Sequence, residues 1–347
     1  MHVVGARPQF IKLAPVTRAF RELGLPYRIL HTGQHYDPSM SRAHFDALGL
    51  EEPHYHLGVG SGTHARQTAR MMEGIEDVLV SLRPSLVLVY GDTNSTLAAS
   101  LSAAKLKIKV GHVEAGVRSF DRTMPEEINR VVADHLSEHH FCPTAGALGL
   151  LEREGIKGLL TGDVMYDAIL QSRPDTLVNP FPTPYALVTI HRAENTDDEA
   201  RFRGIWAGLE LVSRELPVIF PVHPRTKAAH ERLLACGTGR IRVIDPVDYL
   251  TMLAMIRDAS LVITDSGGVQ KEAFLLETPC VTARESTEWP ETVDAGANML
   301  CPAAPDEVYR AALAMLGRTV KAEANPFGDG GAAKAIAAFL KERYGGP

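Results

Sequence analysis

Short apolar runs and amphipathic stretches alternate along almost the whole chain of 347 residues. The apolar runs have the length of strands and are rich in Val, Ile and Leu, while the stretches between them repeat at helical spacing. Continuous apolar strands are typical of parallel sheets that are covered by helices on both faces. The pattern therefore predicts an α/β fold. The predicted strands are Val3–Val4, Tyr27–Thr32, Leu86–Tyr90, Val110–Val113, Tyr185–Ile190, Val218–Val222, Arg242–Ile244, Leu261–Thr264 and Cys280–Thr282.

One predicted helix, which opens at Pro125, carries both apolar and charged positions. Glu126 and Arg130 are four residues apart, so they share one face of it. The inner stripe that faces the core is predicted to consist of Ile128, Val131, Val132 and Leu136.

A proline-rich segment interrupts the alternation near the middle of the chain. It contains Pro174, Pro180, Pro182 and Pro184, which exclude a helix or a central strand. A chain of this length also exceeds the size at which single cores stop growing. We therefore expect two Rossmann-like domains that face a cleft, over residues 1–172 and 185–330, with a linker over 173–184.

Composition narrows the class of protein. The net charge of −6 disfavours general nucleic-acid binding, and no apolar run approaches the length of a membrane span or of a signal peptide. The scattered residues Cys142, Cys236, Cys280 and Cys301 are expected to be reduced thiols. We therefore expect a cytoplasmic enzyme with no membrane and no nucleic-acid partner. The first strand is short, which leaves open whether the natural chain starts a few residues earlier.

Polar motifs follow five of the predicted strands, where ligands bind in open parallel sheets. Ser266, Gly267 and Gly268 precede a predicted helix, whose free N–H groups could hold a diphosphate together with the guanidinium of Arg7. An N-cap followed by a flexible turn is the simpler explanation of this motif alone. The histidines at 135, 139 and 140 lack metal-site spacing, and no Walker A lysine motif occurs. Neither a metal nor a cofactor is therefore expected.

Carboxylates and a histidine occupy other strand ends. Asp92 and Glu114 follow two strands of the first domain, where burial would suit a carboxylate to proton transfer. A helix cap for Asp92 and a hydrogen-bonded turn for Glu114 are equally good explanations. His191 ends the first strand of the second domain and could donate to a phosphate or move a proton, although a lone histidine is more often structural. Glu126 with Arg130, taken alone, is an ion pair on a helix face.

Taken together, these segments resemble the non-hydrolysing UDP-N-acetylglucosamine 2-epimerases over essentially the whole chain. The similar segments are GARPQFIK at 5–12, HTGQHYD at 31–37, YGDTNSTLA at 90–98, GHVEAGVRSFD at 111–121, MPEEINR at 124–130, HRAENTDD at 191–198, HPRT at 223–226 and TDSGGVQKEA at 264–273. The resemblance implies a fold of the GT-B type, in which a C-terminal helix over about 331–347 returns to the first domain. It also implies a homodimer that binds a UDP-sugar.

The resemblance also implies roles for individual residues. The catalytic positions are Asp92, Glu114, Glu126 and His191. The substrate-binding positions are Arg7, Lys12, Arg130, Ser266, Gly267, Gly268 and Glu272, of which Glu272 would accept hydrogen bonds from the ribose hydroxyls. The implied reaction interconverts UDP-N-acetylglucosamine and UDP-N-acetylmannosamine. UDP is eliminated to leave 2-acetamidoglucal and then adds back, with H2 removed on one face and returned on the other. Which of Asp92 and Glu114 acts as the base stays open.

Departures from the family pattern leave the substrate open. Trp289 stands where the family commonly has an arginine near the nucleotide, and Tyr36 replaces an arginine that is common after the Gln-His pair. Several segments look closer to the branch that acts on UDP-2,3-diacetamido-2,3-dideoxyglucuronate, whose C6 carboxylate would need a donor such as Arg118, Arg122 or Arg284. A GT-B glycosyltransferase and a noncatalytic nucleotide-sugar sensor are the alternatives from other classes.

Overall fold

The computed structural model describes residues 1–34, 45, 48–222, 226, 227, 231, 233, 240–321 and 325–345. Tyr36, Cys236 and parts of the segments HTGQHYD and HPRT lie outside these residues. The chain divides into two compact units. Unit 1 comprises Met1–Ser172 and Asn325–Pro347, and unit 2 comprises Arg173–Ala324. Each unit is described by itself.

The described part of unit 1 is built on a seven-stranded parallel sheet in the order β3-β2-β1-β4-β5-β6-β7. Successive strands are added on one side of β1 up to β3 and on its other side from β4 onward, so a topological switch point lies between β1 and β4. The strands are β1 (His2–Val4), β2 (Ile29–His31), β3 (Tyr55–His56), β4 (Leu86–Tyr90), β5 (Lys109–Val113), β6 (His139–Cys142) and β7 (Leu159–Leu160).

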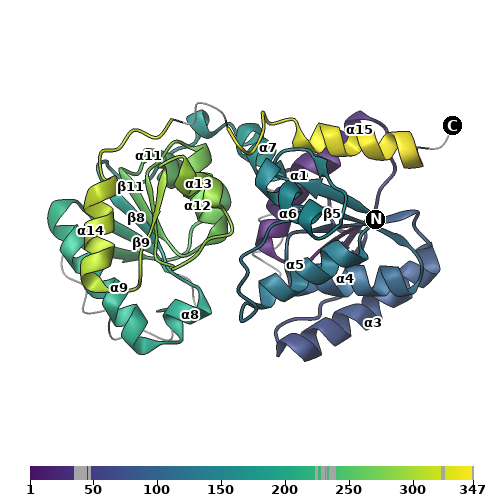
Figure 1. Ribbon diagram of the computed structural model, residues 1–347, viewed down its shortest axis with the longest axis horizontal. Helices are drawn as coiled ribbons and strands as arrows, with labels where there is room; N and C mark the ends of the chain where they lie inside the picture. Colours follow the sequence, from purple (N-terminus) through teal and green to yellow (C-terminus); the bar gives the residue numbers. More distant parts are fainter. Residues whose placement is uncertain are drawn as a thin grey trace. The chain divides into compact units, whose positions relative to one another are not determined.

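Alternate residues of the central strands pack on opposite layers of helices. Val4, Leu86 and Leu88 share a core with α1 and α15, whereas Val3 and Val87 share one with α3 and α4. Figure 1 shows α15, in yellow, beside α1, with α3, α4 and α5 on the other side of the sheet. The helices are α1 (Arg7–Glu22), α3 (His64–Leu82), α4 (Asn94–Lys105), α5 (Pro125–Leu136), α6 (Ala145–Arg153), α7 (Val164–Gln171) and α15 (Ala332–Tyr344).

The described part of unit 2 repeats this architecture with a six-stranded parallel sheet in the order β10-β9-β8-β11-β12-β13. Its strands are β8 (Ala186–Thr189), β9 (Val218–Pro221), β10 (Ile241–Ile244), β11 (Leu261–Thr264), β12 (Cys280–Thr282) and β13 (Asn298–Leu300). Its helices are η1 (Pro174–Thr176), α8 (Ala193–Thr196), α9 (Glu199–Glu215), α11 (Tyr249–Asp258), α12 (Gly267–Leu275), α13 (Pro290–Asp294) and α14 (Pro305–Met315). Helices α9 and α14 cover one face, and α11 packs on the other.

The predicted α/β class with two Rossmann-like domains is confirmed. The predicted inner stripe of α5 is wrong. Ile128 is 49% exposed and Val131, Val132 and Leu136 are only half-buried. The buried face of α5 instead consists of Glu127, Asn129, Arg130, Ala133 and Asp134. Within the described residues, no helix combines the length and the apolar character needed to cross a membrane.

Candidate active site

Asp92 and Glu114 follow adjacent parallel strands, β4 and β5, so both lie at the same edge of the unit 1 sheet. The backbone turns sharply at both places. Gly91 has a φ of +59° and Glu114 a φ of +73°, and the left-handed region is uncommon for a residue with a side chain. Such strain is kept where surrounding contacts determine the conformation, and this occurs often at functional sites.

Glu114 is held against a cation from α1. Lys12 Nζ donates to Glu114 Oε1 at 2.5 Å, and each side chain is 8% exposed. Gly91 leaves the space for this pair, because a β-carbon there would lie 3.0 Å from Lys12 Nζ and 3.4 Å from Glu114 Oε1. The structure therefore brings three separate segments, α1 and the loops after β4 and β5, to one point.

Asp92 is held against a second cation, from α5. Arg130 Nη2 forms an ion pair with Asp92 Oδ2, and Arg130 Nη1 donates to Glu127 Oε2 at 3.0 Å. Asn129 adds a hydrogen bond of 2.9 Å from its amide to the Asp92 carbonyl. Arg130 is buried together with Glu127, and Glu126, which the sequence predicts on the same face as Arg130, is half-buried.

The sequence analysis missed Glu127 and Asn129 as parts of this edge. Glu127 accepts hydrogen bonds from the Ser119 N–H at 2.8 Å and the Phe120 N–H at 3.1 Å, and so fixes the loop before α5. The sequence carries a signal for Glu127. Glu127, Arg130 and Asp134 are spaced i, i+3 and i+7, which gives α5 a polar stripe at the helical period.

In unit 2, Asp265 organises the loop that carries His191. Asp265 is fully buried after β11 and accepts from the N–H groups of His191 at 3.1 Å and Arg192 at 3.0 Å, and from Asn195 Nδ2 at 3.1 Å. The imidazole of His191 is 42% exposed, and its Nδ1 lies 3.7 Å from Asp265 Oδ1. The buried carboxylate therefore fixes the backbone of this loop while the histidine ring keeps access to solvent.

The predicted anion cradle lies at the start of α12. Ser266 caps this helix by accepting from the Val269 N–H at 3.4 Å. A β-carbon on Gly267 would lie 3.6 Å from Trp289 Nε1 and 3.7 Å from Arg192 Nη2, so both donors stand beside the free N–H groups of the helix. Glu288, the nearby carboxylate, is held by Arg284 at 2.8 Å and 3.1 Å. This pairing offsets a charge that would otherwise repel an anion.

Other predicted residues flank these two groups. Arg7 is the first residue of α1 and is half-buried, and Glu272 is buried within α12. Lys271 is also buried, with its Nζ 3.9 Å above the ring of Trp289, so a cation stands next to the indole. In the parts of the chain that the structure describes, no three His, Cys, Asp or Glu side chains are grouped so as to hold a metal ion.

Comparison with known proteins finds relatives over nearly the whole chain. The family model described as UDP-N-acetylglucosamine 2-epimerase matches residues 18–341. The chain is 46% identical to the UDP-2,3-diacetamido-2,3-dideoxy-D-glucuronate 2-epimerase of Pseudomonas aeruginosa, over 97% of this chain and 98% of that one. It is 42% identical to the UDP-N-acetylglucosamine 2-epimerase of Methanocaldococcus jannaschii, over 97% of each. The crystal structure of a Methanocaldococcus jannaschii UDP-GlcNAc 2-epimerase in complex with UDP-GlcNAc and UDP superposes with a TM-score of 0.91 at 41% identity, covering 98% of this chain and 99% of that one.

Proposed function

Because the chain belongs to the UDP-N-acetylglucosamine 2-epimerase family, we propose that it inverts C2 of UDP-N-acetylglucosamine. The observation that carries the proposal is the pair of carboxylates at one edge of the unit 1 sheet, Asp92 and Glu114, each held against its own cation. A glycosyltransferase would need an acceptor site, and neither it nor a sensor accounts for two carboxylates that are each oriented by a cation.

The chemistry of the substrate explains why such residues are needed. The C2 hydrogen of an N-acetylhexosamine is not next to a carbonyl, so direct removal is unfavourable. Elimination of UDP makes C2 inversion accessible, because the 2-acetamidoglucal intermediate can take a proton on either face as UDP adds back. A positioned acid or base contributes on the order of 10² to 10⁴ in rate to each proton transfer. Asp92, Glu114, Glu126 and His191 are the groups proposed for these transfers.

The departing diphosphate needs donors that meet its growing negative charge. The start of α12 offers the N–H groups of Gly267 and Gly268, and Arg192 lies beside them. Each well-placed donor of this kind is worth roughly 3 to 4 kcal/mol in a transition state. We assign Ser266 to the same anion and Glu272 to the ribose hydroxyls. Arg7 and Lys12 are the proposed substrate-binding residues of unit 1.

A second substrate is the diacetamido uronate on which the Pseudomonas aeruginosa relative acts, since that relative is 46% identical to this chain. The reaction would be the same C2 inversion. Its C6 carboxylate would need a cation, and two of the three candidates are already engaged. Arg118 is paired with Asp134 and Glu154, and Arg284 with Glu288. Arg122 is exposed and is the remaining candidate.

Proton NMR of the enzyme in deuterated water tests both substrates. Deuterium at C2 with appearance of the manno epimer from UDP-N-acetylglucosamine would support the first proposal. Exchange with the diacetamido uronate alone would keep the reaction and change the substrate, and no exchange with either would refute the epimerase. Asp92→Asn and Glu114→Gln should abolish exchange and leave UDP binding intact, whereas loss of UDP affinity in both would refute their catalytic role.

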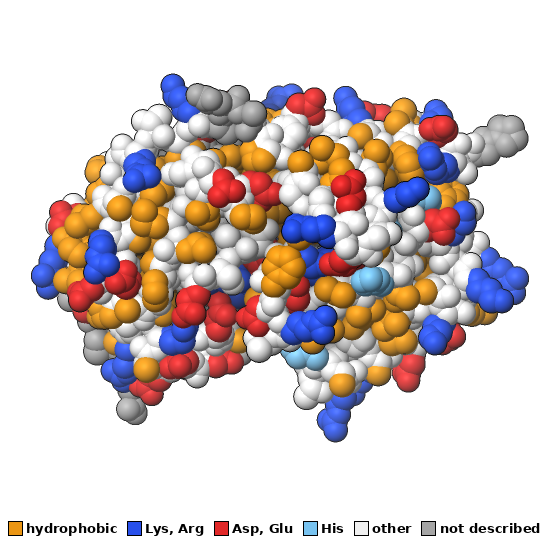
Figure 2. Space-filling view, in the orientation of Figure 1, with side chains coloured by type: hydrophobic (Ala, Val, Ile, Leu, Met, Phe, Trp, Pro, Cys, Tyr) orange, Lys and Arg blue, Asp and Glu red, His pale blue; other side chains and the backbone are white. Residues whose placement is uncertain are grey.

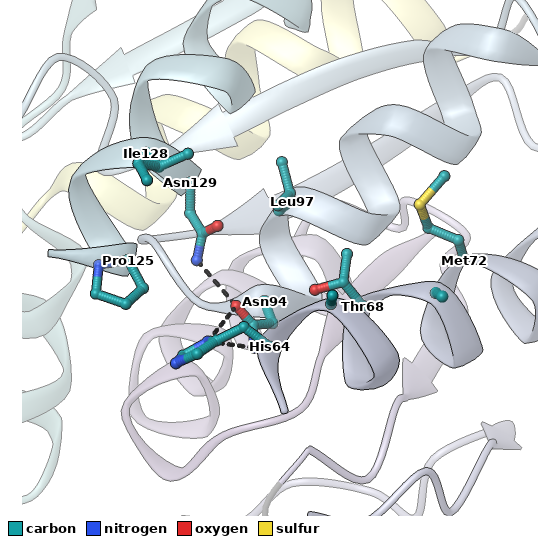
Figure 3. A pocket seen from close by; sticks show the side chains of 10 residues that line it. His64, Thr68, Met72, Asn94, Leu97, Pro125, Ile128 and Asn129 are labelled. Atoms are coloured by element: carbon teal, nitrogen blue, oxygen red, sulfur yellow. Dashed lines mark hydrogen bonds between the residues drawn. The ribbon is translucent and has the colours of Figure 1, made fainter. Parts of the chain in front are cut away.

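We further propose a homodimer that forms through the outer face of α3, α4 and α5. An apolar groove of about 340 Å³ lies on this face, lined by Ala65, Ala69 and Met72 from α3, by Leu97 from α4 and by Ile128 from α5. Figure 2 shows hydrophobic side chains gathered there, and Figure 3 shows the groove closed at one end by the bonded side chains of His64, Asn94 and Asn129.

The charges of α3 suit pairing with a second copy. Arg66 and Arg70 are exposed in its first half, and Glu73, Glu76 and Asp77 are exposed in its second half. A two-fold axis perpendicular to α3 sets it antiparallel to its copy, so that basic and acidic halves meet. Ile128→Asp should give a monomer by light scattering after gel filtration. Val178→Asp, at an 83% exposed site in unit 2, should remain dimeric. A dimer in both variants would refute this face.

We also propose that the protein works in the cytoplasm. The support is its thiol chemistry, because Cys142, Cys280 and Cys301 are buried free thiols in the structure. Reduced thiols are the rule in reducing compartments. Fractionation of the native host with an antibody would test the location, and recovery of the protein outside the cell would contradict it.

A further inference from the structure

His112 links the two loops that carry Asp92 and Glu114. It lies on β5 and is fully buried. Its Nδ1 is 2.7 Å from Asp134 Oδ1, and its Nε2 is 2.8 Å from the carbonyl oxygen of Gly91. A carbonyl can only accept, so Nε2 carries a hydrogen and donates to the residue that immediately precedes Asp92.

Asp134 completes the link from the other side. Its Oδ2 accepts from the Gly116 N–H at 3.1 Å, two residues after Glu114, and from Arg118 Nη1 at 2.6 Å. Burial pushes the pKa of Asp134 upward, but the charges and hydrogen bonds of His112 and Arg118 outweigh burial and hold that pKa below its usual value. Asp134 is therefore a carboxylate that binds both loops through its two oxygens.

The outer end of this network faces solvent. Arg118 Nε and Nη2 donate to Glu154 at 2.9 Å each, and the side chain of Glu154 is 30% exposed. His140 Nε2 lies 2.7 Å from the backbone carbonyl of Asp134. Glu154 contacts neither the Gly91 carbonyl nor the Gly116 N–H, which makes it a useful control.

We propose that His112 and Asp134 are positioning residues that hold Asp92 and Glu114 in reactive geometry for the proposed epimerase reaction. Three residues at or beside these carboxylates have a left-handed backbone conformation, with φ of +59° at Gly91, +73° at Glu114 and +82° at Gly116. A strained residue with a side chain costs on the order of 1–3 kcal/mol and persists only when contacts determine it. Glu114 is the residue that bears this cost, and the bonds from His112 to Gly91 and from Asp134 to Gly116 fix the glycine turns beside Asp92 and Glu114.

The inference rests on the proposed function, because its readout is C2 exchange. His112→Gln replaces a rigid ring with a flexible chain whose donors sit on a single nitrogen, so it cannot reproduce the two contacts that His112 makes from separate ring nitrogens. A misplacement of about 1 Å can cost about 10²-fold in rate. We therefore expect kcat to fall about 10- to 100-fold while KM and UDP affinity stay within about threefold. A group needed only for stability would lower the amount of folded enzyme without changing the kcat of the folded fraction.

Two further variants separate a positioning role from a general effect on the network. Asp134→Asn keeps the shape and can still join His112 to Gly116 as a neutral amide, so it should lose less kcat than His112→Gln. Glu154→Gln, at the outer end, should keep the full kcat. An unchanged kcat in folded His112→Gln, an equal loss in Glu154→Gln, or unfolding of both His112→Gln and Asp134→Asn would each overturn the inference. Absence of exchange in the unsubstituted enzyme would instead refute the proposed function.

Discussion

Replacing Gly267 by alanine is expected to weaken UDP binding without destabilising the protein. Gly267 is the first residue of α12 and has no positive φ, so alanine fits its backbone. The added β-carbon would lie 3.5 Å from Glu288 Oε2, 3.6 Å from Trp289 Nε1 and 3.7 Å from Arg192 Nη2. These are ordinary van der Waals distances, so the folded protein accepts the methyl group. A diphosphate that approaches the same donors would instead collide with the methyl group.

Gly267→Ala is expected to raise the stability of the folded protein and to lower its affinity for UDP. Glycine to alanine at a compatible position stabilises by about 0.4–1 kcal/mol, chiefly by restricting the unfolded chain. Loss of one hydrogen bond to a charged group costs about 1.5–3 kcal/mol, which is about a 10- to 150-fold weaker Kd. Titration calorimetry with UDP measures the affinity, and a thermal melt without ligand measures the stability.

Gly149→Ala provides the matched control. Gly149 lies inside α6, and a β-carbon there would meet nothing within 4 Å. Alanine should therefore stabilise this helix and leave UDP affinity unchanged. The assignment of the cradle would be refuted if Gly267→Ala bound UDP within about threefold of the unsubstituted protein, or if Gly149→Ala weakened UDP binding equally.

Three other substitutions test unit 1 and the core. Gly116→Ala should destabilise unit 1 by about 2 kcal/mol or more, because φ is +82° and the β-carbon would lie 2.3 Å from the backbone oxygen of Ala147; an unchanged urea midpoint would contradict this. The hydrogen bond from Arg118 lowers the pKa of Glu154, so the stability that this pair contributes is present above the unfolded pKa and is lost as pH falls from about 5 to about 3. Glu154→Gln should therefore reduce the loss of unfolding free energy over this pH range. An equal loss in the variant and the unsubstituted protein would argue against the pair. Burial raises the pKa of the thiols of Cys142, Cys280 and Cys301 to about 12, so in a Cys236→Ser protein Ellman's reagent should label none until denaturant is added; rapid labelling would show that a thiol is accessible.

Most of the inner strands could be predicted from the sequence, and so could the edge strand β10, whereas the edge strands β3, β7 and β13 could not. Leu86–Tyr90, Leu261–Thr264 and Cys280–Thr282 form strands with the predicted bounds, because central strands in a parallel sheet are apolar on both faces. Strands β3 and β7 are only two residues long and were not predicted. Nor was β6, whose sequence His-His-Phe-Cys begins with two polar residues. Strands this short or this polar carry too little pattern to be read locally.

The polar face of α5 was missed for a different reason. Hydrophobic periodicity assigns apolar residues to the core, and that rule fails where a helix covers the polar loops at the end of a sheet. Buried charges are tolerated when they are paired, and Arg130 and Asp134 have partners on neighbouring loops that are remote in sequence. Ile128 is consequently turned outward, toward the face proposed for the dimer.

The two units hold their functional groups by different physical means, and this difference has a kinetic consequence. In unit 1 the groups proposed for the chemistry are side chains, and the cations Lys12 and Arg130 fix their geometry. In unit 2 the proposed anion cradle is largely backbone N–H, which a helix fixes without any side-chain entropy. Substitutions around Asp92 and Glu114 should therefore act mainly on kcat, because they disturb an orientation that the transition state needs. Substitutions around Gly267 should act on KM as well, because ground state and transition state both carry the diphosphate.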